Sequence, residues 1–154
     1  MTVFTGINNH VQGLLFVIAA FLFIFSSGFI FFDPLNWNSF AHDLFKTLCH
    51  QFHWRTYAAN DLYMATCTRC FGIYSGMFIG CLSIPFIRKK IKPVFINAII
   101  FIVSTLAFNF IDFTGNFLGL WTNTLHSRMM LGIPFGFSIS YLILTAYYIQ
   151  TQKK

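Results

Sequence analysis

The chain has 154 residues, of which 56% are hydrophobic and only 9% are charged. A soluble protein of this size needs far more charge to cover its surface, so the composition predicts a single membrane domain. The formal net charge is +6, and six of the ten basic residues lie in two short segments. They are not interleaved with stacking aromatic residues on a soluble domain, which argues against a nucleic-acid partner.

The first predicted element is an apolar run at residues 13–32, which is long enough to cross the hydrocarbon of a bilayer. No basic leader precedes this run and no clear small-residue cleavage site follows it. It therefore predicts a transmembrane helix rather than a signal peptide. Asp33 and Pro34 are expected to end the helix.

An amphipathic pattern follows at residues 37–52, with apolar side chains spaced as on one face of a helix. The opposite face carries His42, Asp43, Lys46, His50 and His53. Such a helix is too polar to cross the bilayer, so we expect it to lie along the membrane surface. Residues 54–66 read as a polar loop with Asn60-Asp61 as its turn signal.

Three further spans are predicted at residues 67–87, 94–111 and 128–149, which makes an all-α protein with four transmembrane helices and one surface helix. Two of these spans carry small residues four apart, namely Gly72, Gly76 and Gly80, then Gly132 and Gly136. Such spacing lets helices approach closely in lipid, so these glycines predict a homodimer interface. In the third span, Thr105, Asn109 and Asp112 share one face.

The charge distribution predicts the topology. Two segments carry basic residues and no acid: Arg88, Lys89, Lys90 and Lys92, then Lys153 and Lys154. The positive-inside rule places both segments in the cytoplasm, so both termini are expected there, in a multi-pass protein of the inner (cytoplasmic) membrane. The polar residues around Cys49, Cys67, Asp112 and Arg128 then share the extracytoplasmic side.

Cysteines on that side predict a metal site. Cys67 and Cys70 have the two-residue gap that lets both thiolates reach one ion, and Cys49 supplies a third sulfur. A nitrogen from His50 or His53 would complete a tetrahedral site, for which zinc is the expected metal. The ligand types alone leave open whether such an ion is a structural staple or a catalytic centre.

Thiol chemistry is the alternative reading of the same motif. A Cys67/Cys70 pair at the start of a helix, facing an oxidising compartment, is typical of a membrane thiol-disulfide oxidoreductase. Such enzymes generally relay electrons through a second cysteine pair, and only Cys49 remains outside the first. Cys81 reads as a small buried hydrophobe. A small transporter subunit is a third class of function, and four spans would need a dimer to enclose a path.

Ionisable groups at the edge of hydrocarbon are costly and usually pair or line a polar cavity. The simplest expectation is an Asp112–Arg128 ion pair. A more specific hypothesis is that Arg55, Arg69 and Arg128 together bind an anionic or lipid-derived ligand. Asn123 and Tyr74 would add hydrogen bonds in that pocket. If the protein is an enzyme, its candidate catalytic residues are Arg55, Arg69, Asp112 and Arg128.

The motifs resemble a known family. Cys49-His50-Gln51 with a following Arg55, then Cys67-x-Arg69-Cys70-x-Gly72-Ile73-Tyr74, are similar to the hallmark of the prokaryotic membrane proteins catalogued as domain of unknown function 2085. Later family positions resemble Asp112, Asn123, Arg128 and Gly132. The resemblance covers about residues 45–140 and implies an integral membrane protein with a polar Cys/His/Arg site, without an established activity. The family usually has proline or an acid just before the arginine. Here His53-Trp54 precede it, so His50 is the preferred ligand.

Overall fold

The computed structural model describes residues 6–31, 36–90 and 95–152. This part of the chain forms the helices α1 (Gly6–Ser26), α2 (Trp37–Phe45), α3 (Thr68–Lys90), α4 (Phe95–Phe117) and α5 (Leu125–Gln152). Between α2 and α3 lie a 3₁₀ helix, η1 (His53–Arg55), and two short strands, β1 (Ala58–Ala59) and β2 (Leu62–Tyr63). The prediction of a mainly helical protein is confirmed.

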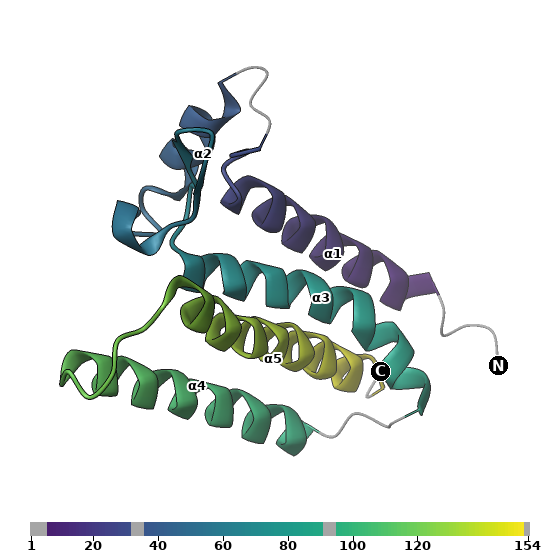
Figure 1. Ribbon diagram of the computed structural model, residues 1–154. Coiled ribbons are helices and arrows are strands. Elements are labelled where there is room, and N and C mark those ends of the chain that lie inside the picture. The colour runs from purple at the N-terminus through teal and green to yellow at the C-terminus, as the bar shows by residue number, and fades with distance from the viewer. Residues whose placement is uncertain (1–5, 32–35, 91–94, 153–154) are drawn as a thin grey trace.

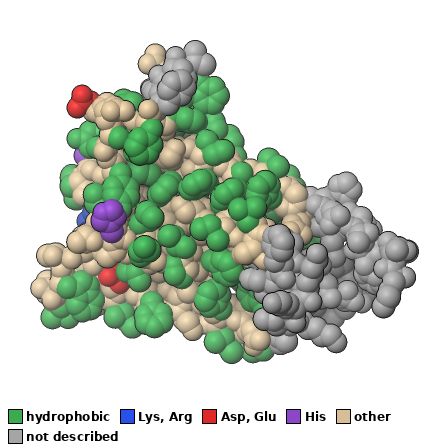
Figure 2. All heavy atoms as spheres, turned by 45° about the vertical axis from the view of Figure 1, so that its right-hand side comes forward, with side chains coloured by type: hydrophobic (Ala, Val, Ile, Leu, Met, Phe, Trp, Pro, Cys, Tyr) green, Lys and Arg blue, Asp and Glu red, His purple; other side chains and the backbone are tan. Residues whose placement is uncertain are grey.

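The four long helices lie side by side in the order α1, α3, α5, α4, so α3 and α5 form the middle of the bundle (Figure 1). The start of α1, the end of α3, the start of α4 and the end of α5 lie at one end of the bundle. At the other end lie α2, η1 and the two strands (Figure 1). Figure 2 shows a largely hydrophobic face, on which the visible charged and histidine side chains lie toward the α2 end.

Two segments of the described chain, Phe95–Phe117 and Leu125–Tyr147, are long and apolar enough to cross a membrane, and Val11–Ser26 is a shorter apolar helix. Each of the four predicted spans overlaps one long helix, but four crossings stay a prediction. The first helix ends at Ser26 rather than at residue 32. The physical reason is local, because Gly28 and Phe29 adopt φ angles of 64° and 53°, which an α-helix does not allow.

The surface helix is also shorter than predicted. It ends at Phe45, and the N–H groups of Leu48 and Cys49 both donate to the Phe45 carbonyl, at 3.0 and 2.9 Å. The chain then turns at Gln51, where φ is 49°. The predicted helix over residues 46–52 is therefore wrong, and Cys49 lies beyond the end of α2. The turn signal at Asn60-Asp61 is confirmed, since both residues have positive φ between the paired strands.

Glycines hold α3 against α5. A Cβ atom on Gly76 would collide with the Ile133 carbonyl, and one on Gly136 would collide with the Ile73 carbonyl. The small residues thus let the two backbones touch, as predicted for helices in lipid. The partner, however, is another helix of the same chain. A homodimer through Gly72, Gly76 and Gly80 or through Gly132 and Gly136 does not fit this packing, because α5 and α3 already cover those faces.

The predicted polar face of the third span meets α5. Thr105 Oγ1 lies 3.1 Å from Ser138 Oγ, and Asn109 Nδ2 donates to the Leu131 carbonyl at 3.1 Å. These contacts satisfy polar groups inside an apolar bundle, where an unpaired group is costly. They also fix the rotation of α4, so that Asp112 on the same face points toward the α2 end of the α3–α5 pair.

Replacement of Gly136 by alanine tests the glycine contact. The added methyl group forces α3 and α5 apart, so we expect Gly136→Ala to lower the free energy of unfolding by about 1–3 kcal/mol. Gly13→Ala is the matched control, since nothing lies within 4 Å of a Cβ there. Thermal unfolding in detergent measures both variants. Equal melting temperatures for Gly136→Ala and wild type would contradict the packing.

Candidate functional site

Three cysteines from separate segments meet at the α2 end of the bundle. The Sγ atoms of Cys49, Cys67 and Cys70 lie within 4.8 Å of one another, and all three thiols are free. Cys49 follows the turn after α2, Cys67 precedes α3, and Cys70 lies in the first turn of α3. The backbone N–H of Cys67 donates to Cys49 Sγ at 3.2 Å. The expected meeting of these sulfurs is confirmed.

Amide side chains position Cys49 against the start of α3. Gln51 Nε2 donates to the carbonyls of His42 at 2.7 Å and Ala65 at 2.9 Å, so it ties α2 to the segment just before Cys67. Asn38 Nδ2 likewise joins the carbonyls of Gly28 and Tyr63, at 2.5 and 2.9 Å. The glutamine of the Cys-His-Gln motif therefore has a structural role that the sequence did not reveal.

The cluster favours a thiolate at Cys49. Hydrogen bonds from the Cys67 and Cys70 thiols lower the pKa of the Cys49 thiol far below its usual value, although burial acts in the opposite direction. The residue is only 6% exposed. A buried thiolate that accepts several hydrogen bonds is a strong ligand for a soft metal ion, because the thiolate rather than the thiol binds metal.

The predicted nitrogen ligand does not join this cluster. Within the described chain the metal-competent group comprises the three cysteines alone. His50 is exposed, and its ring lies against Phe52 with 5.7 Å between ring centroids. His53 packs edge-on against Tyr63 at 4.6 Å. Cys81 is buried elsewhere, 3.7 Å from Ser140 Oγ. A bound ion would receive three sulfur ligands here, and the described residues would add no fourth His, Cys, Asp or Glu ligand.

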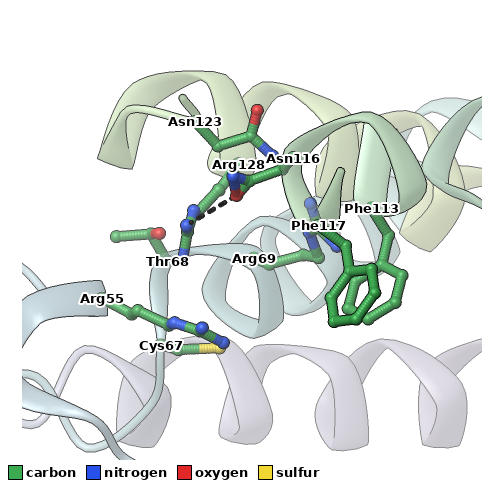
Figure 3. A pocket seen from close by; sticks show the side chains of 9 residues that line it. All are labelled: Arg55, Cys67, Thr68, Arg69, Phe113, Asn116, Phe117, Asn123 and Arg128. Atoms are coloured by element: carbon green, nitrogen blue, oxygen red, sulfur yellow. Dashed lines mark hydrogen bonds between the residues drawn. The ribbon is translucent and has the colours of Figure 1, made fainter. Parts of the chain in front are cut away.

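A cavity of about 380 Å³ adjoins the cluster and shares Cys67 with it (Figure 3). Its lining combines side chains from η1, the start of α3, the end of α4 and the start of α5: Arg55, Cys67, Thr68, Arg69, Phe113, Asn116, Phe117, Asn123 and Arg128. The sequence predicted the three arginines and Asn123. Tyr74 is not among the lining residues, and its ring packs on Phe45 at 5.5 Å.

Thr68, Phe113, Asn116 and Phe117 escaped the sequence reasoning as ligand contacts. Thr68 lies inside the Cys-x-x-Cys motif, and this position between two cysteines could have identified it as a candidate site residue. The other three lie on α4, which continues to Phe117 beyond the predicted end at residue 111. Because the helix is longer than predicted, these three residues lie beside the arginines of the pocket.

Asp112 pairs with Arg69 and not with Arg128. Arg69 Nη2 donates to Asp112 Oδ2, and the same carboxylate oxygen accepts a 2.6 Å hydrogen bond from Asn123 Nδ2. Arg128 Nη2 instead faces Asn116 Oδ1 at 3.4 Å. The predicted Asp112–Arg128 ion pair is therefore wrong. Gly132 explains the difference, because its missing side chain lets the Arg69 backbone press against α5, from where the guanidinium reaches α4.

Three buried polar atoms of the described chain have no hydrogen-bond partner, and all belong to residues that line the cavity. They are Thr68 Oγ1, Arg69 Nε and Arg128 Nε. Buried polar groups are nearly always paired, so this concentration of unpaired donors is unusual. Three arginines face one aspartate here. The arginine and aspartate side chains alone therefore carry a net charge of +2, and together with the unused donors this is the chemistry of an anion site.

Comparison with known proteins gives the family. The sequence model of the family described as "Predicted membrane protein (DUF2085)" matches residues 49–142. An uncharacterised protein from Methanocaldococcus jannaschii is 30% identical over 111 residues, which cover 72% of this chain and 70% of the relative. No solved structure matches this chain. The chain thus belongs to this family of predicted membrane proteins, and the resemblance seen in its motifs is confirmed.

The substitution Asp112→Asn tests the ion pair. The substitution removes the negative charge that faces the Arg69 guanidinium. The Arg69 side chain is 25% exposed and the Asp112 side chain is 13% exposed. We expect a loss of about 1–3 kcal/mol in the free energy of unfolding, less than for a fully buried pair. Asp61→Asn at the exposed hairpin turn is the control and should be neutral, since asparagine tolerates positive φ. Equal thermal stability of both variants would contradict this account.

Proposed function

We propose that this membrane protein binds a soft metal ion, zinc by its ligand set, through Cys49, Cys67 and Cys70, and holds an anionic ligand beside it with Arg55, Arg69 and Arg128. One observation carries the proposal. Cys67 belongs both to the sulfur cluster and to the wall of the arginine pocket, so the ion and the anion would share one cavity. The ligand would be lipid-derived or another small anion.

The ligand number favours chemistry over a purely structural role. Structural zinc sites are usually closed by four protein ligands, whereas catalytic sites keep one position for water or substrate. Here three sulfurs converge and His50 lies apart. An ion in such a site would supply an activated water, and the arginines would neutralise the anion on which it acts. Metal-assisted hydrolysis at a lipid head group is therefore the reaction we assign if the protein is an enzyme.

The topology belongs to the same proposal. Four crossings, with both termini in the cytoplasm, put the cysteines and arginines on the extracytoplasmic side of the inner membrane. The common end of the bundle at which α1 begins and α5 ends supports this arrangement (Figure 1). The assignment of sides rests on basic residues. Arg88, Lys89 and Lys90 end α3, whereas Lys92, Lys153 and Lys154 lie outside the described residues.

Thiol-disulfide exchange is the second candidate, and the same cluster favours it, because three free thiols within 4.8 Å of one another can form a disulfide. An external oxidant such as a quinone would take two electrons and two protons from two of the three thiols, which would then be joined as a disulfide and lost as ligands of any ion. The redox and metal functions therefore exclude each other on a single molecule at a given moment.

Metal content separates the two candidates. We expect purified wild-type protein to carry about one zinc ion per chain, and Cys67→Ser and Cys70→Ser to lose it, because two sulfurs alone bind weakly. Cys81→Ser and His50→Ala are the controls and should keep the metal, since neither residue lies in the cluster. Elemental analysis measures this. Metal-free wild type in which thiol trapping finds a Cys67–Cys70 disulfide would favour the oxidoreductase.

A further inference from the structure

We propose that the ligand of the arginine pocket is a lipid phosphomonoester, with its phosphate among the arginines and its hydrocarbon chain passing Phe113 and Phe117 into the bilayer. The inference rests on the anion half of the proposed function and is independent of the metal half. It assigns ligand contacts to Thr68, Phe113 and Phe117.

The charge of the pocket selects the head group. Three arginines and one aspartate carry a net charge of +2, before any negative charge on the neighbouring cysteines is counted. A phosphomonoester carries about −1.5 to −2 at neutral pH and presents three strong acceptor oxygens, whereas a carboxylate or a phosphodiester carries a single negative charge. The unpaired donors are also three, Thr68 Oγ1, Arg69 Nε and Arg128 Nε. Charge and donor number therefore both fit a terminal phosphate.

The apolar lining on the opposite side of the pocket indicates that the ligand is a lipid. Phe113 and Phe117 line the cavity while they are 57% and 80% exposed. Their rings are stacked, with 6.5 Å between centroids and 13° between planes. In Figure 3 the two rings lie together at one edge of the pocket, while Arg55 and Cys67 lie at the other edge. The cavity is thus polar at one edge and apolar at the other.

The position of these rings on α4 gives the direction of access. This helix is one of the two in the described chain that are long and apolar enough to cross a membrane. Its outer surface continues with exposed apolar side chains such as Phe110, at 67%. A ligand that passes along these rings therefore comes from hydrocarbon rather than from water, and its chain stays there while the phosphate reaches the arginines. Burial of the chain against two phenylalanines adds affinity that a free phosphate lacks.

Binding to the purified full-length protein in detergent micelles tests the inference. The probes are dioleoyl phosphatidic acid, dioleoyl phosphatidylglycerol, glycerol 3-phosphate and inorganic phosphate, with affinities read from ligand-induced shifts in melting temperature and from native mass spectrometry. We expect phosphatidic acid to bind at least about tenfold more tightly than any other probe. Phosphatidylglycerol supplies the tails without the second charge, and glycerol phosphate supplies the charge without the tails.

Variants locate the two halves of the ligand. Phe117→Ala should weaken phosphatidic acid roughly tenfold and leave glycerol phosphate unchanged, because it removes only apolar contact. Phe108→Ala is the matched control, since Phe108 is 65% exposed on the same helix and lies half a turn around it from Phe117. Arg128→Gln should weaken all phosphate probes. Arg55→Gln, at an exposed position, should do so to a smaller extent without risk to folding.

The outcomes separate this inference from the function on which it rests. Equal binding of glycerol phosphate and phosphatidic acid, with Phe117→Ala harmless, would overturn the lipid assignment and leave the anion pocket standing. Equal affinities for phosphatidylglycerol and phosphatidic acid would contradict the assignment of the head group as a phosphomonoester. Phosphate affinities that are the same in wild type, Arg55→Gln and Arg128→Gln would contradict the anion pocket itself. Zinc content of the same samples reports on the metal half in every case.

Discussion

The backbone contact between α3 and α5 is the constraint on which the site depends. Glycines on both helices remove the side chains that would hold them apart, so the carbonyl of Arg69 lies where a Cβ of Gly132 would otherwise be. Arg69 and Arg128 therefore begin from neighbouring backbones. Arg69 is close enough to reach past α5 to Asp112 on α4, and the guanidinium of Arg128 is left to face Asn116. A looser helix pair would spread these groups apart.

The segment between α2 and α3 supplies the other half of the site by a different physical means. It has little regular structure, and hydrogen bonds from Gln51 and Asn38 to backbone carbonyls hold it in place. These bonds bring Cys49 onto the backbone N–H of Cys67. Phe45 and Ala41, both fully buried, anchor α2 beneath this loop. The sulfur cluster thus forms where a side-chain network meets the start of a rigid helix.

The sequence predicted the features that depend on periodicity and local chemistry. The helical content, the glycine contacts, the turn at Asn60-Asp61 and the meeting of three cysteines all follow from spacing and residue type. The sequence did not predict the features that depend on tertiary contacts. An apolar pattern that continues to Phe52 does not reveal that Gln51 turns the chain, and no local signal indicates which arginine reaches Asp112. The glycines predict a close helix contact, but only the fold shows that the partner is in the same chain.

The unpaired charge of the pocket is the strongest indication of function, because stability alone does not explain it. Asp112 can neutralise one guanidinium, and it does so at Arg69. Arg128 then remains with a buried Nε that donates to nothing in the described chain, next to an equally unpaired Thr68 hydroxyl. Uncompensated charge that is withdrawn from water is costly, and apolar replacements of similar volume are often neutral or stabilising. A fold that needed only to pack would be more stable with apolar residues at these positions. An anion that enters the pocket reverses the cost, since each donor then gains a charge-assisted hydrogen bond in a medium of low dielectric constant.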